Sequence, residues 1–417
     1  MKYYLFLLLL FKVCFAEAQL YFPGNQWDTL SPSTLNWCPN EIAALDSFLI
    51  EANSKSFIIL KGGKIVHEAY YGTYTQDSLW YWASAGKTLK AFLIGKAQEE
   101  GYLSIQDSSS KYLGQAWTSL SPAKEGLISI EDQLQMTTGL DYLIPDLDCT
   151  ADSCLKYKAD AGSQWFYHNA PYLLLKDVLE NATGQSLNRY TQITLAGSIG
   201  FRGLWFDNLY VSTARQMARF GLLLLAEGQW NGNTILADTN YFNAMISSSQ
   251  SINPAYGYLT WLNGSSSYMQ PGWPFSFNGM MIPSAPADLY MAAGKNDQRI
   301  YVVPSQQLVV VRQGNAADSS TFALSSFDDE LWQRISALNC QGVALSENKI
   351  KPSIYPNRGQ GIIHLPEEIK LIQVSNVAGQ PIKHLRTNSN LDLRGHPPGV
   401  YYLSFEDGST LPYVLLP

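Results

Sequence analysis

Charged side chains are scarce in this sequence. Asp, Glu, Lys and Arg make up 15% of the 417 residues, against roughly 25% in an average soluble domain. The 28 basic residues are outnumbered by 35 acidic ones, for a net charge of −7. A nucleic-acid-binding surface needs a basic excess to neutralise phosphates, so the composition argues against nucleic acid as a partner. Hydrophobic residues reach 46%, which excludes an intrinsically disordered chain and is enough for a sizeable core.

Long apolar runs are missing beyond residue 20, so we expect no membrane-spanning helix there. The first residues are the exception. A basic residue precedes a short apolar stretch, which is followed by the small-x-small cleavage pattern Ala16-Glu17-Ala18. This pattern is typical of a secretory signal peptide. We therefore predict a signal peptide at residues 1–18 and an exported, secreted or cell-surface protein that starts near Gln19.

Cysteine is also rare, with five in the chain, one of them inside the predicted signal peptide. The remaining four are an even set in an exported chain, which favours disulfides. Cys149 and Cys154 are near neighbours in a polar loop, while Cys38 and Cys340 each lie at the edge of a predicted helix. We expect the pairs Cys149–Cys154 and Cys38–Cys340, with another pairing or free thiols as the alternative. No Cys/His cluster has metal-binding spacing, and we expect no cofactor.

The secondary-structure patterns place strands at both ends of the main region and helices between them. Five segments have the composition of β-strands. They are residues 56–60, 64–70, 289–293, 299–303 and 308–312. Three segments have helical spacing. They are residues 39–53, 87–100 and 327–338. A sheet built from both ends brings the first helix near the last one, and the Cys38–Cys340 pairing follows from this closure.

The composition changes after Cys340. Residues 341–352 are polar and have the character of a linker. Residues 353–417 contain short strands separated by Gly, Pro or Asn, which predicts a small all-β domain near the lower size limit for independent folding. The predicted main domain therefore spans residues 19–340.

The clearest candidate for chemistry is Ser84-Ala85-Gly86-Lys87. Ser84 and Lys87 lie one turn apart on one helix face, and a serine at a helix N-terminus sits in a field that stabilises an alkoxide. A buried lysine has a lowered pKa, so its amine can accept the serine proton. The same spacing recurs elsewhere, but only Ser84 stands between an aromatic run and the start of a strong helix. The alternative is a surface helix capped by a serine.

Two further patterns carry candidate polar groups. In Tyr167-His168-Asn169, a tyrosine hydroxyl near a lysine can act as acid or base, and Asn169 can orient a lysine or a substrate carbonyl. Lys295, at the end of a predicted strand, can stabilise a tyrosinate or hold a carboxylate. Taken by itself, the first pattern is explained by an interior tyrosine with a satisfied hydroxyl, and the second by a solvated lysine in a turn. A Ser-His-Asp triad that uses His168 is the alternative catalytic arrangement.

Together, in this order and spacing, the three patterns resemble the serine β-lactamase and penicillin-binding-protein superfamily, most of all its class C-like and esterase branch. The likeness covers about residues 35–340. Residues 134–140 (LQMTTGL) and 299–304 (RIYVVP) add to it. The resemblance implies an α/β fold, with an antiparallel sheet flanked by helices and an all-helical insertion domain at about residues 98–285.

The resemblance also implies an acyl-enzyme mechanism on a small-molecule or peptide-like carbonyl substrate. Ser84 would attack an ester, amide or lactam carbonyl. Lys87 and Tyr167 would move protons to and from Ser84 and the leaving group. Asn169 would position Lys87 and the substrate.

The third pattern supplies two further roles and one departure from the family. Lys295 would keep the site electropositive, and the backbone N–H groups of Ser84 and Gln298 would hold the oxyanion. Asp297 stands where the family usually has glycine. We expect its side chain and charge to narrow the cleft, which favours neutral or cationic esters and amides.

Residues 353–417 resemble the C-terminal sorting domain of the type IX secretion system. The likeness rests on residues 354–357 (IYPN), 369–374, Gly379 and 398–402 (PGVYY). It implies that the type IX secretion machinery is a partner. The sequence as a whole predicts a secreted serine hydrolase. The alternatives are a peptidoglycan DD-peptidase and a non-catalytic ligand-binding protein on the same fold.

Overall fold

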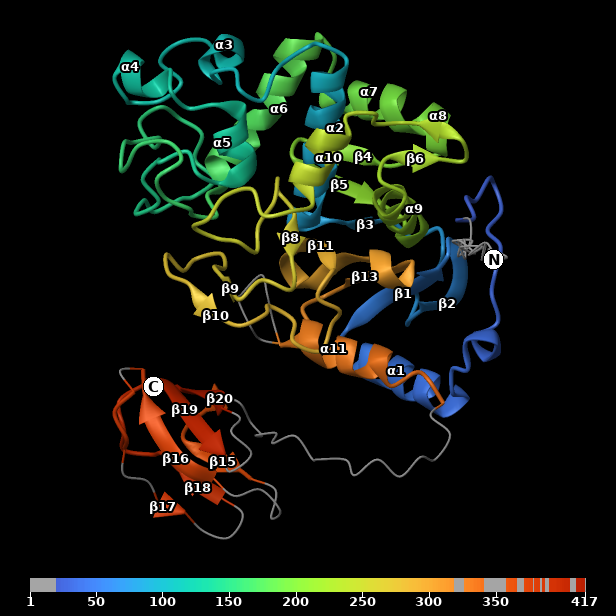
Figure 1. Cartoon of the computed structure of the whole chain (residues 1–417), viewed down its shortest axis with the longest axis vertical. Helices are drawn as coiled ribbons and strands as arrows, with labels where there is room; N and C mark the ends of the chain where they lie inside the picture. Colours follow the sequence, from blue (N-terminus) through green and yellow to red (C-terminus); the bar gives the residue numbers. More distant parts are fainter. Residues whose placement is uncertain are drawn as a thin grey trace, which may run out of the picture. The chain divides into compact units, whose positions relative to one another are not determined.

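The structure is a computed structural model of the chain (Figure 1). It describes residues 20–318, 326–340, 358–365, 371–377, 379–382, 385–386, 390–405 and 410–416. The chain divides into two compact units, Met1–Cys340 and Gln341–Pro417. The predicted signal peptide and linker lie outside the described residues.

The first unit is built on a six-stranded sheet with the order β2-β1-β13-β12-β11-β8, and every neighbouring pair is antiparallel. Its strands are β1 (Ser54–Lys61), β2 (Lys64–Tyr70), β8 (Trp261–Leu262), β11 (Tyr290–Gly294), β12 (Gln298–Val303) and β13 (Leu308–Gly314). Because β1 pairs with β13, segments from both ends of this unit meet inside the sheet, as predicted. The predicted fold class is confirmed.

The β1–β2 hairpin turns at two glycines, as the sequence predicts. Gly62 and Gly63 have φ values of 58° and 85°, a left-handed conformation that glycine adopts without steric cost. A side chain at Gly63 would also meet the backbone oxygen of Tyr21 at 1.9 Å. The turn therefore requires a glycine at this position.

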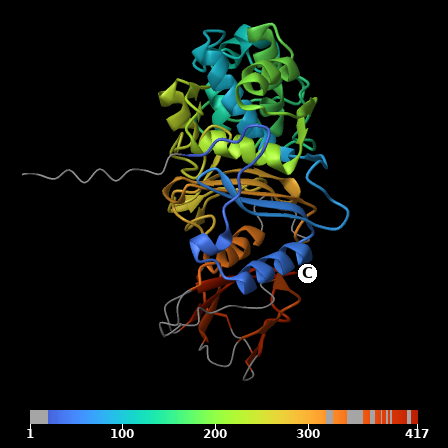
Figure 2. The same cartoon turned by 90° about the vertical axis from the view of Figure 1, so that its right-hand side faces the viewer.

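Helices cover both faces of the sheet (Figures 1 and 2). On one face, α9 (Ala214–Leu225) packs across β1, β12 and β13. On the other, α1 (Pro39–Glu51) packs against α11 (Phe327–Ser336), next to the Cys38–Cys340 disulfide. All residues of β12 and β13 are buried. Their apolar runs fit strands that are covered on both faces.

A mostly helical region lies between β2 and β11 in the sequence. Besides α9, its helices are α2 (Gly86–Glu99), α3 (Ser110–Leu113), α4 (Pro122–Glu125), α5 (Ile130–Gln135), α6 (Asn169–Thr183), α7 (Leu187–Thr191), α8 (Gly197–Ile199) and α10 (Thr239–Met245). It also contains short strands. They are β3 (Trp80–Tyr81), β4 (Leu204–Phe206), β5 (Leu209–Ser212), β6 (Gln229–Trp230), β7 (Asn233–Thr234), β9 (Ser267–Tyr268) and β10 (Phe277–Asn278). Within the predicted insertion, about residues 98–285, the structure is mainly but not entirely helical, because β4 to β10 lie there.

The second unit is all-β in its described part. Its strands are β14 (Arg358–Gly359), β15 (Ile362–His364), β16 (Leu371–Asn376), β17 (Leu385–Arg386), β18 (Asn390–Asp392), β19 (Gly399–Phe405) and β20 (Thr410–Leu415). They form a four-stranded sheet, β14-β20-β19-β16, and a three-stranded sheet, β15-β18-β17. The unit has an apolar core of its own, which includes Val374, Leu403 and Tyr413.

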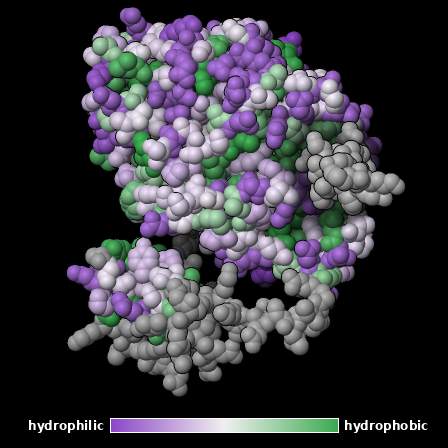
Figure 3. All heavy atoms as spheres, in the orientation of Figure 1, coloured by the Kyte–Doolittle hydropathy of each residue, from purple (hydrophilic) through white to green (hydrophobic). Residues whose placement is uncertain are grey.

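Within the described residues, no helix combines the length and the apolar character needed to cross a bilayer. Polar and apolar residues are interspersed on the face of the first unit seen in Figure 3.

Candidate active site

Ser84 lies in a single helical turn, η2 (Ala83–Ala85), that runs directly into α2. The turn is anchored by Trp82, which is fully buried and donates its indole N–H to the Ser212 hydroxyl at 2.8 Å. Ala83 has a φ of 47°, a left-handed conformation that turns the chain sharply before the helix. Ser84 itself is only half-buried. The fold therefore places a half-buried serine at the N-terminus of a buried helix.

Lys87 lies in the first turn of α2 and is 4% exposed. Its amine nitrogen is 3.5 Å from the ring centre of Tyr172 and 5.4 Å from that of Tyr167. Burial lowers the pKa of Lys87 to about 7, although the charge of Asp148 acts in the opposite direction. No carboxylate in the described part of the chain forms an ion pair with this amine. Much of the Lys87 population is therefore the free amine at neutral pH.

Tyr167 directly precedes His168, the residue that caps α6, and its ring stacks on Trp261 with the ring centres 5.7 Å apart. Burial raises the pKa of Tyr167, and a side-chain hydrogen bond with Ser84 partly offsets this. The phenol therefore stays protonated at neutral pH. The structure brings Ser84, Lys87 and Tyr167 together at one place.

Asn169 begins α6, and its side-chain oxygen is buried without a partner among the described residues. Its predicted positioning role stays a prediction. His168 is 3% exposed, and its two ring nitrogens also have no partner in that part of the chain. Burial lowers the pKa of His168 to about 4, against the charges of Asp141 and Asp148. His168 is thus a neutral ring without the hydrogen bonds that a Ser-His-Asp triad requires.

Gly294, the last residue of β11, abuts the turn that carries Ser84. A Cβ added to Gly294 would lie 2.3 Å from the Trp82 oxygen, 2.9 Å from the Ala85 nitrogen and 3.1 Å from the Ser84 nitrogen. Only a glycine permits this approach between the strand and the turn. Sequence reasoning missed Gly294, although a glycine that ends an apolar strand was a visible signal.

Lys295 and Gln298 lie beyond this contact. Lys295 follows Gly294 directly, and its side chain is exposed. Gln298 pairs with Gly294 across the β11–β12 hairpin, and its side chain is buried. Its amide donates to the backbone oxygens of Gly314 at 2.6 Å and Asn296 at 2.8 Å. The predicted roles of Lys295 and of the Gln298 N–H group stay predictions.

The expectation that Asp297 brings a negative charge into the cleft is wrong. Asp297 is 5% exposed, and its carboxylate pairs with the Arg299 guanidinium at 3.0 Å. The same carboxylate accepts the backbone N–H of Ala317 at 2.9 Å. A left-handed turn at Asn296 and Asp297 directs the carboxylate to these partners, which no local sequence pattern showed.

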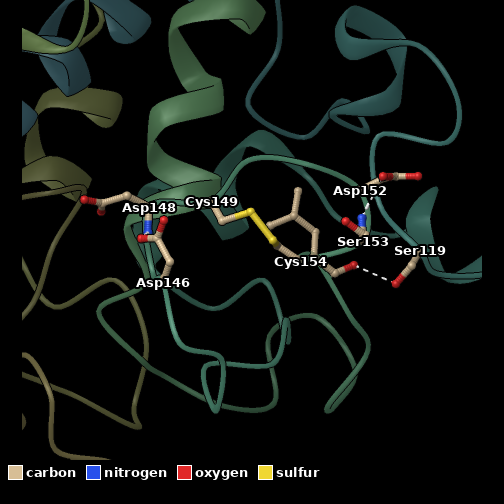
Figure 4. Close-up of a disulfide and its surroundings, with 8 residues drawn as sticks. Ser119, Asp146, Asp148, Cys149, Asp152, Ser153 and Cys154 are labelled. Carbon is tan, nitrogen blue, oxygen red and sulfur yellow. Dashed lines mark hydrogen bonds between the residues drawn. A yellow bond between two sulfur atoms is a disulfide. The ribbon is translucent and has the colours of Figure 1, made fainter.

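Both predicted disulfides are present, with Cα–Cα distances of 5.0 Å for Cys38–Cys340 and 6.0 Å for Cys149–Cys154. The second closes a small loop directly after Asp148, whose side chain points away from the sulfur atoms (Figure 4). The neighbouring Leu147 oxygen accepts the N–H of Ala170 at 2.8 Å, next to Asn169. This bond ties the disulfide loop to the first turn of α6, beside the candidate site.

Sequence reasoning also missed Tyr172, whose ring faces the Lys87 amine, and Lys90, whose amine lies near the same ring. Tyr172, on α6, is 3% exposed, and its ring lies near the amines of both Lys87 and Lys90. A buried contact between two helices leaves no local signal in the sequence. Among the described residues, no group of His, Cys, Asp and Glu side chains could hold a metal ion.

Comparison with known proteins places this arrangement in a family. The family model described as Beta-lactamase matches residues 49–325. A curated relative, an uncharacterized protein of Alkalihalophilus pseudofirmus, is 23% identical over 317 residues, which is 66% of this chain and 87% of the relative.

Solved structures show the same fold at low sequence identity. A proposed 6-aminohexanoate-dimer hydrolase from Bacillus anthracis is 18% identical with a TM-score of 0.57, and the match covers 76% of this chain and 88% of that one. A family VIII carboxylesterase is 13% identical with a TM-score of 0.53, and the match covers 73% and 98%. Because the family model spans most of the first unit, this chain belongs to the beta-lactamase family.

Proposed function

We propose that this protein is a serine hydrolase that cleaves an ester, amide or lactam through an acyl-enzyme on Ser84. One observation carries the proposal. A half-buried serine stands one helical turn before a buried lysine whose pKa is lowered to about 7, and its side chain hydrogen-bonds with that of a buried tyrosine. An activated nucleophile with an adjacent base is the arrangement that covalent catalysis requires.

In the first half of the reaction, the Ser84 oxygen forms a bond to the substrate carbonyl carbon. Its proton passes to the free amine of Lys87, and the carbonyl π electrons move to the oxygen. The backbone N–H groups of Ser84 and Gln298 are the donors that we propose for the resulting oxyanion. When the oxyanion collapses, the leaving group departs with the electron pair of the cleaved bond and takes the hydroxyl proton of Tyr167. The Lys87 ammonium returns a proton to Tyr167, so that the amine is free again for the second half of the reaction.

Lys87 and Tyr167 differ in protonation state near pH 7, and this difference sets their roles. Lys87 is the base, because much of its amine is free near pH 7. Tyr167 is protonated at that pH, so its O–H group is a donor to the leaving group or to the Ser84 oxygen. In the second half, a water molecule attacks the acyl carbon, loses a proton to the free amine, and Ser84 leaves with the proton returned to it.

Neutral or cationic linear esters and amides are the substrates we favour. Asp148 is the charged residue outside α2 that acts on the pKa of Lys87. It is exposed and makes no ion pair within the described residues. A carboxylate at this place repels anionic substrates. The similar folds of a carboxylesterase and a proposed 6-aminohexanoate-dimer hydrolase support the same choice.

We further propose that the protein is exported and that its C-terminal unit serves type IX secretion. Two disulfides favour an oxidising compartment. An all-β unit with its own core follows the catalytic unit, as a sorting domain would. To test this point, export of a reporter fused to residues 341–417 is compared with export of the reporter alone, in a host with type IX machinery.

The catalytic proposal is tested by a hydrolysis screen of the chain from Gln19 onward, with p-nitrophenyl esters, anilides, a chromogenic lactam and D-Ala-D-Ala peptides. We expect turnover of esters or linear amides and its loss in Ser84→Ala. Activity confined to D-Ala-D-Ala peptides would favour a peptidoglycan peptidase. Ligand binding that is unchanged in Ser84→Ala, with no turnover of any substrate, would favour a non-catalytic binder.

A further inference from the structure

The segment before Ser84 is hydrogen-bonded to the turn between β11 and β12. Tyr81 is the last residue of β3, and its hydroxyl accepts a hydrogen bond from the side-chain amide of Asn296 at 2.7 Å. Asn296 lies in η4 (Lys295–Asp297), the turn that leads into Gln298. This bond therefore joins the two segments that carry the proposed oxyanion donors, the backbone N–H groups of Ser84 and Gln298.

The turn η4 has a backbone conformation that needs support. Asn296 and Asp297 have φ values of 61° and 57°, and two consecutive left-handed residues without a glycine are costly. The Arg312 guanidinium, from β13, donates to the backbone oxygens of Asn296 at 2.9 Å and Asp297 at 3.1 Å. Tyr81 holds the turn from another sheet, because β3 pairs with β5 and lies outside the six-stranded sheet.

The same network fixes Gln298. Its side chain is fully buried, and its amide donates to the backbone oxygens of Gly314 at 2.6 Å and Asn296 at 2.8 Å. The Gly314 oxygen also accepts the indole N–H of Trp80 at 3.2 Å. Both residues of β3 are therefore linked to Gln298 through one shared partner, Trp80 through the Gly314 oxygen and Tyr81 through Asn296.

An oxyanion donor is effective only when it is already placed, about 3 Å from the position where the charge develops, before the reaction begins. We propose that Tyr81 and Asn296 are positioning residues. Their hydrogen bond holds η4 against the segment that carries Ser84 and thereby keeps the Gln298 N–H group where the oxyanion forms. This inference rests on the proposed function.

The test compares two substrates that differ in one atom. p-Nitrophenyl acetate forms an oxyanion, whereas in the matched thionoester sulfur replaces the carbonyl oxygen, and sulfur is a weak hydrogen-bond acceptor. A misplaced oxyanion donor therefore slows the ester more than the thionoester and lowers the ratio of their kcat/KM values. A general loss of folded protein slows both substrates equally and leaves the ratio unchanged. Release of p-nitrophenol reports acylation even where the acyl group is hydrolysed slowly.

Two variants remove the hydrogen bond from its two ends. In Tyr81→Phe, which loses the hydroxyl alone, we expect kcat/KM for the ester to fall by about 10-fold and the ratio by about fivefold, less than the 100-fold or more that loss of a whole donor causes. Asn296→Gly loses the amide and keeps the left-handed turn, so it should have the same effect. The double variant should be no slower than the slower single variant, because both changes remove one bond.

Tyr190→Phe is the matched control. The Tyr190 hydroxyl donates to the Glu100 carboxylate at 2.8 Å, so this variant also loses one tyrosine hydrogen bond. Because that bond joins α7 to the end of α2 and touches neither β3 nor η4, we expect its loss to leave the ratio unchanged.

Each outcome supports or overturns the inference. An unchanged ratio in folded Tyr81→Phe, with activity on both substrates, would overturn it and leave the proposed function intact. If Tyr81→Phe does not fold, as judged by its thermal unfolding, the ratio in Asn296→Gly decides the question in the same way. An equal fall of the ratio in Tyr190→Phe would also overturn it. A wild-type protein that releases no p-nitrophenol from the ester would overturn the proposed ester hydrolysis on Ser84 and this inference together.

Discussion

Gly294→Ala is the change that most directly probes how the sheet supports the nucleophile. Gly294 has a φ of −130°, which alanine adopts without strain, so the substitution acts through the added methyl group alone. That methyl group would lie 2.3 Å from the Trp82 oxygen and 3.1 Å from the Ser84 nitrogen.

The size of the effect follows from these distances. Ordinary contact begins near 3.4 Å, so the strand and the turn must separate by about 1 Å to admit the methyl group. A misplacement of about 1 Å costs a reaction about 100-fold in rate, or about 2.7 kcal/mol of transition-state stabilisation. Overpacking of a buried contact also lowers the free energy of unfolding by about 1–3 kcal/mol.

The assay compares fluorophosphonate labelling and thermal unfolding of Gly294→Ala with those of Gly197→Ala. Gly197 is helical, and an added Cβ meets nothing within 4 Å. Alanine there should raise the stability by about 0.5–1 kcal/mol and leave labelling unchanged. Labelling of Gly294→Ala at the wild-type rate would refute the close contact between β11 and the Ser84 turn.

Three other predictions follow from the same geometry. In Lys87→Met, steady-state rates should fall by at least about 100-fold, because the free amine is the base. The variant should also lose the rise in rate with pH through about 7 that we expect for the wild type. A retained rise would assign that titration to another group. Asp148→Asn removes a charge that favours the Lys87 ammonium, so the rise in rate should move to lower pH by a few tenths of a unit, and a shift to higher pH would contradict the assignment. Replacing Cys38 and Cys340 by alanine opens a link across 302 residues and should lower the free energy of unfolding by up to about 5 kcal/mol, as measured by denaturant titration; an unchanged midpoint would refute the stabilising role.

The sheet could be predicted from the sequence because its signals are local. Gly62-Gly63 marks a hairpin between two β-rich runs, and residues 289–312 alternate strands with polar turns. The placement of residues 56–70 beside residues 289–312 followed from strands at both ends of the main region, and the structure shows that β1 pairs with β13 there. The Cys38–Cys340 disulfide followed from the same closure.

The site was only partly predictable, because its remaining contacts join distant segments. Ser84 and Lys87 are one helical turn apart, and this spacing, together with the aromatic run before Ser84 and the strong helix after it, indicated a nucleophile and its base. The approach of Gly294 to the Ser84 turn, and of Tyr172 to Lys87, depends on how β11 and α6 pack against η2 and α2. Asp297 was misread because its partner Arg299 lies on the buried side of β12.

The central claim is that Ser84 forms the acyl-enzyme, and acid quenching of a reaction with a slowly hydrolysed ester tests it most directly. Intact-mass measurement followed by peptide mapping should find one acyl group per chain, on the peptide that contains Ser84, and none in Ser84→Ala. Turnover without an acyl group on that peptide, or an acyl group that persists in Ser84→Ala, would contradict the account.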